Sequence, residues 1–332
     1  MSVVYFIVQQ TMFFSIPLLI VAIGAMFSER SGVINIALEG TMIIGAFASI
    51  MFINLLQTAI RTAQYPTGII ALLQRQPMLL LVMAILIAVA SGILISLAHA
   101  YASVNMKANQ IISGTAINLF APAFAIYAAR MQGHTQQIFF DNQFRIESVP
   151  VIGDMPFIGP MFFQNTYITT YLGFTILAVA WVVLYRTKFG LRLRACGEHP
   201  QAADSLGINV YKMRYAGVCI SGALAGLGGL VFVIPTSIVF DATVSGYGFL
   251  ALAVLIFGQW RPGRILFAAL FFGVLSAIAS SHSGIPFLFE LGIPARIYRM
   301  SPYVATLVVL AFTSKNSQAP RAGGIPYDAG VR

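Results

Sequence analysis

Charged side chains are scarce in this sequence of 332 residues. Asp, Glu, Lys and Arg together make up 9% of it, whereas a soluble globular domain carries about 25%. Hydrophobic residues make up 58%, and the mean hydropathy is +0.85. Because the deficit of charge extends along the whole chain, the composition excludes an ordinary soluble domain and predicts a protein whose solvent is lipid.

Sequence motifs for catalysis and metal binding are also missing. There is no Gly-x-x-x-x-Gly-Lys-Ser/Thr phosphate loop, no His-Glu-x-x-His pair and no Gly-x-Ser-x-Gly turn, so the chain offers no site for ATP or for hydrolytic chemistry. Cys196 and Cys219 have neither disulfide-framework nor metal-ligand spacing. We therefore expect no catalytic residue, no metal and no cofactor. No basic helix with interleaved aromatic residues is present, which excludes nucleic-acid binding.

Long uncharged runs take the place of these motifs. Most of them approach the roughly 20 residues that a helix needs to cross about 30 Å of hydrocarbon. They predict an all-α fold, a polytopic integral membrane bundle with about nine transmembrane segments (eight to ten), some of them broken or re-entrant helices. The runs cover roughly 1–28, 40–60, 78–98, 110–129, 166–185, 215–240, 242–260, 265–281 and 300–314.

The basic residues between these runs are distributed unevenly. If the segment 186–214 is cytoplasmic, nine spans place 13 Lys and Arg on that side and six on the other. The positive-inside rule then predicts an outer N-terminus and a cytoplasmic C-terminus. We expect one transmembrane domain over 1–314 and a disordered cytoplasmic tail over 315–332, which shows no periodicity. The outer loop at about 130–166 is either an interfacial hairpin or a docking surface for an external partner, and the sequence assigns no role to the one at about 57–77.

Four polar residues within the apolar runs are candidates for a translocation pathway. Asn35 and Glu39 are four residues apart, so on a helix they share one face. A carboxylate there is costly in lipid and should face protein or water, which leaves two interpretations open. Glu39 lines or gates a pathway, or it caps a broken helix or pairs with Arg30. Asn118 and Thr243 either line the same pathway or satisfy backbone groups where helices break.

The segment 186–214 holds six basic and two acidic residues in this weakly charged chain. A proline follows shortly after Glu198 and Gly207 can end a helix, so the segment predicts a short amphipathic cytoplasmic helix between them. Ala202 and Ala203 would give this helix a narrow face able to enter a groove. An ordinary basic loop is the alternative.

The spacing Glu198-x-x-x-Ala202-Ala203-x-x-x-Gly207 is similar to the Glu-Ala-Ala…Gly motif of permease subunits in ABC importers. Three longer stretches resemble the branched-chain amino acid/ribose class of these permeases, and in particular its simple-sugar/nucleoside sub-branch, which works with basic-membrane-protein-type binding lipoproteins. They are "SGVINIALEGTMIIGAFAS", "GLRLRACGEHPQAADSLGINVYKMRY" and "GYGFLALAVLIFGQWRPGR". The resemblance spans roughly residues 10–313.

The resemblance implies a membrane-spanning permease subunit of an ATP-driven importer in a prokaryotic plasma (inner) membrane. It implies no enzyme activity in this chain, because a separate cytoplasmic ABC ATPase subunit would hydrolyse ATP. A second homologous permease subunit, in a homodimer or heterodimer, and an extracytoplasmic solute-binding lipoprotein would complete the complex. The resemblance assigns ATPase coupling to Glu198, Ala202, Ala203, Asp204 and Gly207.

The solute is expected to be small, neutral and polar, because few charges lie in the spans. The sub-branch indicates a nucleoside first and a simple sugar next, moved by alternating access, with a branched-chain amino acid as the alternative substrate. A self-contained secondary transporter or channel is the competing function. It would need ion ligands near mid-membrane, where Glu39 is the one plausible acidic residue.

Overall fold

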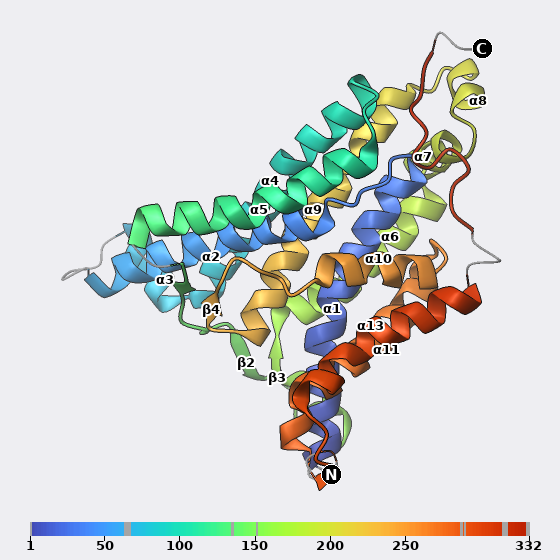
Figure 1. Ribbon diagram of the computed structural model, residues 1–332. Coiled ribbons are helices and arrows are strands. Elements are labelled where there is room, and N and C mark those ends of the chain that lie inside the picture. Colours follow the sequence, from blue (N-terminus) through green and yellow to red (C-terminus); the bar gives the residue numbers. More distant parts are fainter. Residues whose placement is uncertain are drawn as a thin grey trace.

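The computed structural model describes residues 2–62, 68–133, 136–150, 152–285, 288, 290–313 and 318–329, and it shows a bundle of helices with the two termini at opposite ends (Figure 1). Within these residues, seven helices are long and apolar enough to cross a membrane. They are α1 (Ser2–Arg30), α2 (Leu38–Thr62), α4 (Pro77–Ala100), α5 (Gln110–Gly133), α6 (Ile168–Arg186), α9 (Val210–Thr236) and α11 (Pro262–Ser281).

These seven helices coincide with seven of the nine predicted runs, which confirms the polytopic helical fold. The other two runs form helices that differ from full spans. The run 242–260 yields α10 (Tyr247–Phe257), whose 11 residues rise about 16 Å, half of the hydrocarbon thickness. The run 300–314 yields α13 (Ala295–Thr313), which begins with Arg296 and Arg299 in its first turns. The expected broken segment is therefore α10.

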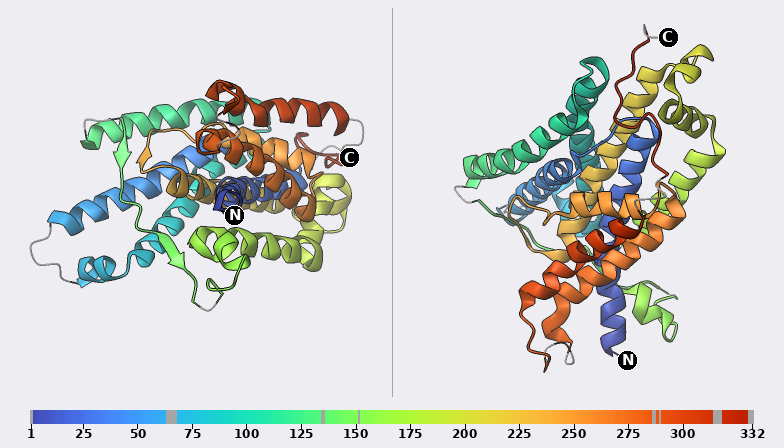
Figure 2. Two further views of the ribbon diagram at one scale, coloured as in Figure 1. Left: turned by 90° about the horizontal axis from the view of Figure 1, so that it is seen from below. Right: turned by 45° about the vertical axis from the view of Figure 1, so that its right-hand side comes forward.

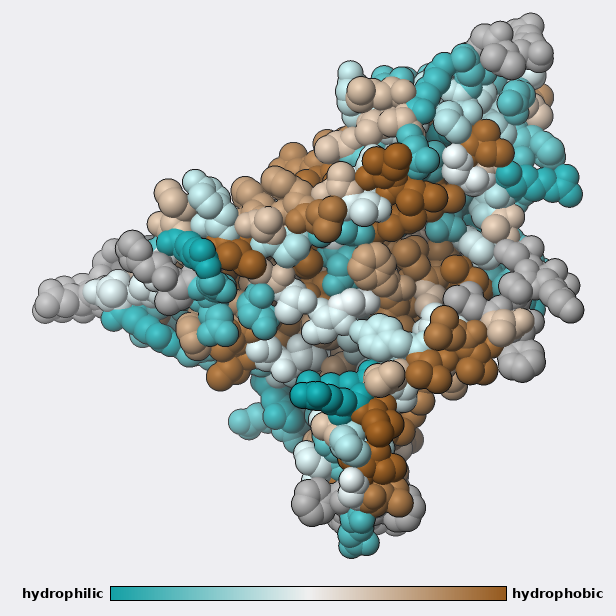
Figure 3. Space-filling model, viewed as in Figure 1, coloured by the Kyte–Doolittle hydropathy of each residue, from teal (hydrophilic) through white to brown (hydrophobic). Residues whose placement is uncertain are grey.

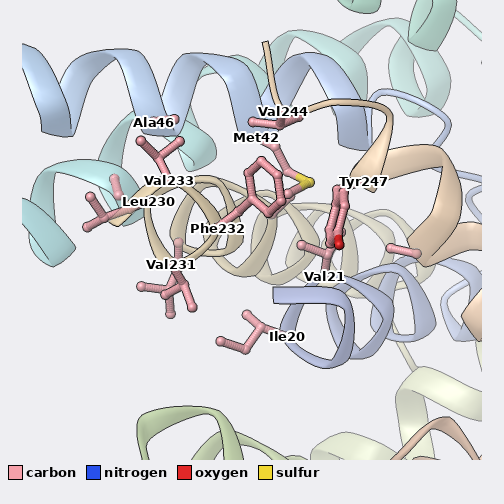
Figure 4. Packing of buried hydrophobic residues seen from close by; sticks show 14 of the residues in the cluster. Ile20, Val21, Met42, Ala46, Leu230, Val231, Phe232, Val233, Val244 and Tyr247 are labelled. Atoms are coloured by element: carbon pink, nitrogen blue, oxygen red, sulfur yellow. The ribbon is translucent and has the colours of Figure 1, made fainter. Parts of the chain in front are cut away.

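Helix α1 occupies the middle of the bundle and packs against α6, α9, α10 and α11 (Figure 2). Its residues from Leu18 to Ile23 are almost completely buried, as expected of a helix that is apolar on every side. Figure 4 shows Met42 of α2, Phe232 of α9 and Tyr247 of α10 meeting beside Val21 of α1. One hydrophobic core thus connects α1 to the short helix α10.

Helices α2, α4 and α9 pack through glycines. A Cβ atom at Gly45 of α2 would collide with the backbone of Gly226 of α9, and one at Gly92 of α4 would collide with the carbonyl of Gly222. Such close backbone approach is the usual function of small residues four apart in membrane helices. The Gly222-x-x-x-Gly226 spacing is therefore a helix-contact face.

Short elements cover the end of the bundle nearer the N-terminus. Strand β1 (Ile138–Phe139) pairs with β4 (Val239–Phe240), and β2 (Arg145–Ser148) pairs with β3 (Gln164–Tyr167), both antiparallel. Asn142 donates to the carbonyl of Ile234 at 2.7 Å, which ties this loop to the end of α9.

The remaining described elements are short and lie in several parts of the molecule. They are α3 (Gly68–Arg75), the π turns η1 (Tyr101–Asn105) and η2 (Gly159–Phe163), the 3₁₀ turn η3 (His282–Gly284), α7 (Lys188–Glu198) and α8 (Pro200–Ser205).

Candidate functional site

The Glu39 carboxylate joins the beginnings of two helices. It lies in the first turn of α2, is 8% exposed, and accepts hydrogen bonds from the first amides of α10. The Gly246 N–H donates to Oε1 at 2.9 Å, and the Gly248 N–H donates to Oε2 at 2.7 Å. A carboxylate at a helix N-terminus satisfies amides that have no partner within the helix and opposes the helix dipole. Glu39 therefore caps the broken helix α10.

Glycine is needed on the other side of this contact. A Cβ atom at Gly248 would collide with the backbone nitrogen of Glu39, and Gly246 has φ = +79°, a conformation that glycine adopts without strain. Arg30 lies elsewhere: its guanidinium pairs with Glu198 at 3.5 Å. Of the interpretations that the sequence leaves open for Glu39, the structure favours capping, and pairing with Arg30 is wrong.

Asn118 and Asn35 hold the irregular segment that precedes α2. The Asn118 side chain accepts from the Gly40 N–H at 2.7 Å and donates to the Ile36 carbonyl at 2.8 Å. Asn35 is buried; it donates to Ser221 Oγ at 2.9 Å and accepts from the N–H of Ala37 at 3.1 Å. Both asparagines thus satisfy backbone or side-chain groups where non-helical backbone interrupts the helices, as such backbone requires inside a membrane bundle.

Thr243 lines a cavity of about 730 Å³ between α1, α9, α10, α11 and α13. Aromatic rings form one wall, where Phe232 and Tyr247 lie 4.2 Å apart between ring centroids. In Figure 3 the centre of the view is pale, meaning intermediate hydropathy, with brown apolar residues above and to the right of it and teal hydrophilic residues directly below. The hydroxyl-bearing residues of the lining are Thr236, Ser237, Thr243, Ser245, Tyr247, Ser276, Ser280, Ser281 and Tyr303.

Two of these hydroxyls have unused hydrogen-bonding capacity. Tyr247 Oη and Ser276 Oγ are buried, and neither makes a well-formed hydrogen bond within the described part of the chain. The lining is mixed, because Gln10, Asp241 and Arg299 stand beside these hydroxyls and the aromatic rings, and a cleft that joins apolar surface to placed polar groups is a candidate small-molecule site. Sequence reasoning missed Phe232, Ser276 and Tyr303, because they belong to three separate runs. A serine in the middle of an apolar run was the one available signal.

The segment 186–214 forms α7 and α8 at the other end of the molecule, the end that carries the C-terminus in Figure 1. Helix α8 starts at Pro200 and is followed by Gly207 at φ = +78°, so the predicted short helix and its limits are confirmed. Ala203 is only 2% exposed and packs against Cys196 and Val210. It faces the protein, and this orientation differs from the predicted groove-entering face.

The other residues predicted for coupling divide into two groups. Ala202, Asp204 and Gly207 are exposed, whereas Glu198 ties α7 to α1 through Arg30. Sequence reasoning missed Leu206, which is 81% exposed at the end of α8. It adds an apolar side chain to the exposed residues of this segment.

The C-terminal segment 318–329 packs across this end of the molecule and differs from the disordered tail predicted for 315–332; residues 314–317 and 330–332 lie outside the described part. Tyr327 is buried beside Tyr211, and burial together with a hydrogen bond to Asp204 raises the pKa of its phenol to about 12. Hydrogen bonds to other segments, two from backbone amides and one from a side chain, hold the chain here although the sequence shows no periodicity. The bonds are Ala322 N–H to Gly197 O (2.9 Å), Gly324 N–H to Gly32 O (3.2 Å) and Arg214 Nη1 to Ile325 O (3.0 Å).

Comparison with known proteins identifies the family to which this chain belongs. Residues 7–312 match the family described as the branched-chain amino acid transport system / permease component. The chain belongs to this permease family. It is a transport subunit, not an enzyme in its own right. Membership implies a multi-pass plasma-membrane protein that works with ATPase and solute-binding partners.

Three relatives show where the permease stands within the family. It is 42% identical to the guanosine ABC transporter permease protein NupQ of Bacillus subtilis, over 98% of this chain and 97% of that protein. It is 39% identical to the nucleoside ABC transporter permease protein NupC of Lactococcus lactis, over 97% and 96%. The putative glucose ABC transporter permease protein TsgC13 of Haloferax volcanii is 28% identical, over 92% and 90%. No solved structure matches the permease.

Proposed function

We propose that this permease is the membrane-spanning subunit of an ATP-driven importer of nucleosides, with simple sugars as the next solute class. The observation that carries the proposal is the cavity beside Thr243, which combines the Phe232 and Tyr247 rings with the buried hydroxyl of Ser276. A nucleoside offers a flat base that stacks on aromatic rings and a sugar that needs hydrogen-bond partners. The names of the nucleoside permeases above support the same solute class.

Alternating access would use the contact between α2 and α10 as a gate. Tyr247 lines the cavity, and the next residue, Gly248, is held by Glu39. The lining of the proposed solute cavity and the hydrogen-bonded contact between α2 and α10 are therefore adjacent in sequence. We assign Thr243 to the lining, Glu39 to the gate, and Asn35 and Asn118 to its support. Both Glu39 oxygens already accept backbone hydrogen bonds, which argues against an ion-coupled secondary transporter.

The ATPase would contact the exposed side of α8. Ala202, Asp204, Leu206 and Gly207 are exposed there, and Ala203 and Glu198 would fix the helix so that a push on α8 reaches α1 and α9. We place α8 in the cytoplasm, with the N-terminus on the outer side where the binding lipoprotein would deliver the solute. A second permease subunit would cover the exposed apolar residues of α5 and α13, among them Ile112, Leu119, Phe120, Val304 and Leu307.

Transport in proteoliposomes tests the proposal. The permease is reconstituted with its ATPase and binding lipoprotein, and ATP-dependent guanosine uptake is measured against competing nucleosides, glucose and leucine. We expect nucleosides to compete strongly, glucose weakly and leucine not at all. Competition by leucine alone, or uptake that proceeds without the ATPase, would overturn the assignment.

A pair of phenylalanine variants tests the cavity itself. Stacking of a base on an aromatic ring is worth about 1–3 kcal/mol, so F232A should raise the KM for guanosine roughly tenfold or more. F6A removes a phenylalanine that is exposed and lies outside the cavity lining, and it should leave KM unchanged. Equal effects of the two variants would show that the solute binds elsewhere.

A further inference from the structure

A second cavity, of about 940 Å³, lies at the α8 end of the molecule between α6, α7, α11 and the C-terminal segment. Its lining is strongly basic: five guanidiniums surround it, with a single carboxylate, that of Glu198. The guanidiniums belong to Arg30, Arg194, Arg261, Arg264 and Arg321. Nothing in solute transport requires this concentration of charge so far from the cavity at Thr243.

The positive charge in this cavity is largely uncompensated. Arg30 pairs with Glu198 at 3.5 Å, yet its Nε atom is buried and has no hydrogen-bond partner in the described chain. The other four arginines form no ion pair with any residue that the structure describes. A concave surface lined by charges of one sign concentrates the field and attracts counter-ions of the opposite sign. The cavity is therefore suited to an anion.

The beginning of α11 strengthens this preference. Arg261 is the N-cap, and Gly263 and Arg264 of the first turn line the cavity. The first amides of a helix have no partner within it and carry the positive end of the helix dipole, an arrangement that binds phosphate groups. Guanidiniums and a helix N-terminus thus surround the same space.

The helices below the cavity indicate that the anion is attached to an apolar chain. Both α6 and α11 pack on α1, with Gly173 against Ile16 and Gly273 against Ser15, and the two helices converge beside α7 (Figure 2, right). On α11, Arg264 shares a face with Phe267, which is 72% exposed, and then with further exposed apolar residues at helical spacing.

Helix α6, like α11, has a polar end at the cavity and an apolar exposed face along the rest of its length. Tyr185 and Trp181 line the cavity, and Phe174 continues their face along the helix, exposed like Trp181. Tyrosine and tryptophan are enriched where the membrane meets water, so these two rings mark the depth of lipid headgroups. Basic pockets between membrane helices at this depth bind anionic headgroups.

We propose that this cavity binds the phosphate headgroup of an anionic phospholipid, whose acyl chains lie along the outward faces of α6 and α11. The lipid belongs to the leaflet at the α8 end. Gln318 and Arg321 of the C-terminal segment also line the cavity, so the lipid holds this segment, and through it α7, against the membrane. The site is independent of the solute and of the transport reaction proposed above.

Native mass spectrometry of the full-length permease in detergent tests the site. The protein is titrated with phosphatidylglycerol and, separately, with phosphatidylcholine. The double variant R261Q/R264Q removes two cavity guanidiniums. R192Q/K212Q removes the same amount of charge from exposed positions of α7 and α9 that do not line the cavity. Thermal unfolding of both variants verifies that they are folded, and the single variant R264K keeps the charge.

We expect the wild type to retain phosphatidylglycerol in preference to phosphatidylcholine. Basic residues near an anionic surface act additively, so R261Q/R264Q should bind phosphatidylglycerol roughly thirtyfold more weakly, whereas R192Q/K212Q and R264K should match the wild type. Equal binding of the two lipids, or equal loss in both double variants, would overturn the proposal. Displacement of the lipid by inorganic phosphate would also overturn it, because the site would then be one for soluble anions. Transport activity enters none of these readouts.

Discussion

Replacing Glu39 by glutamine should weaken the contact between α2 and α10 without changing the shape of the side chain. In the wild type, the two carboxylate oxygens accept from Gly246 at 2.9 Å and from Gly248 at 2.7 Å. Glutamine keeps one acceptor and places an NH₂ group against the other amide. One hydrogen bond to a charged group is worth about 1.5–3 kcal/mol, and the unpaired donor adds a desolvation cost. The total loss is about 3 kcal/mol.

That loss corresponds to a roughly 150-fold shift in the opening of the contact. Hydrogen exchange of the peptide that covers residues 243–250 measures the shift directly, because the Gly246 and Gly248 amides are protected by the carboxylate. We expect E39Q to lower their protection by about two orders of magnitude. In proteoliposomes, ATP-independent leak of solute should rise and ATP-driven accumulation should fall, while the complex with the ATPase still assembles.

E147Q is the matched control, since Glu147 is exposed on β2, a strand that pairs with β3. It should leave exchange and transport at wild-type values. If E39Q also left the protection of Gly246 and Gly248 unchanged, the carboxylate would not hold α10. If protection fell while leak and accumulation stayed the same, the contact would be structural and the gate would lie elsewhere.

Three further predictions concern the α8 end. In a pull-down assay, L206E should bind the ATPase roughly tenfold more weakly or worse, since burying a leucine contributes about 1.5–3 kcal/mol. The control L291E changes a half-exposed leucine outside this end and should bind the ATPase normally. Burial raises the pKa of Cys196 to about 11, which keeps the thiol protonated at pH 8. Cys196 should therefore resist iodoacetamide while the thiol of L206C reacts, and rapid labelling of Cys196 would contradict its burial. Y327A should release the C-terminal segment, so that trypsin cleaves faster after the already exposed Arg321, whereas Y327F should keep the wild-type cleavage pattern. Identical digests of Y327A and the wild type would show that the ring does not hold the segment.

The sequence was sufficient for the long spans, because about 20 uncharged residues in a row have few structural alternatives. It left Glu39 undecided, since its partner Gly248 lies 209 residues away in sequence. The inward orientation of Ala203 was equally out of reach, because six residues of helix are too short to show a periodic pattern. The order of the C-terminal segment depends on backbone bonds to Gly32 and Gly197, which leave no trace in composition.

The glycine contacts among α2, α4 and α9 distinguish positions where the permease cannot accept a larger side chain from positions where it can. Gly45, Gly92 and Gly226 meet backbone to backbone, so no side chain there can grow without moving a whole helix. The cavity at Thr243 is lined by replaceable rings and hydroxyls, many of them on α10, α11 and α13. If the cavity holds the solute as proposed, selection for a different solute can act on the lining while the frame stays constant, which fits a family whose members are named for guanosine and for glucose.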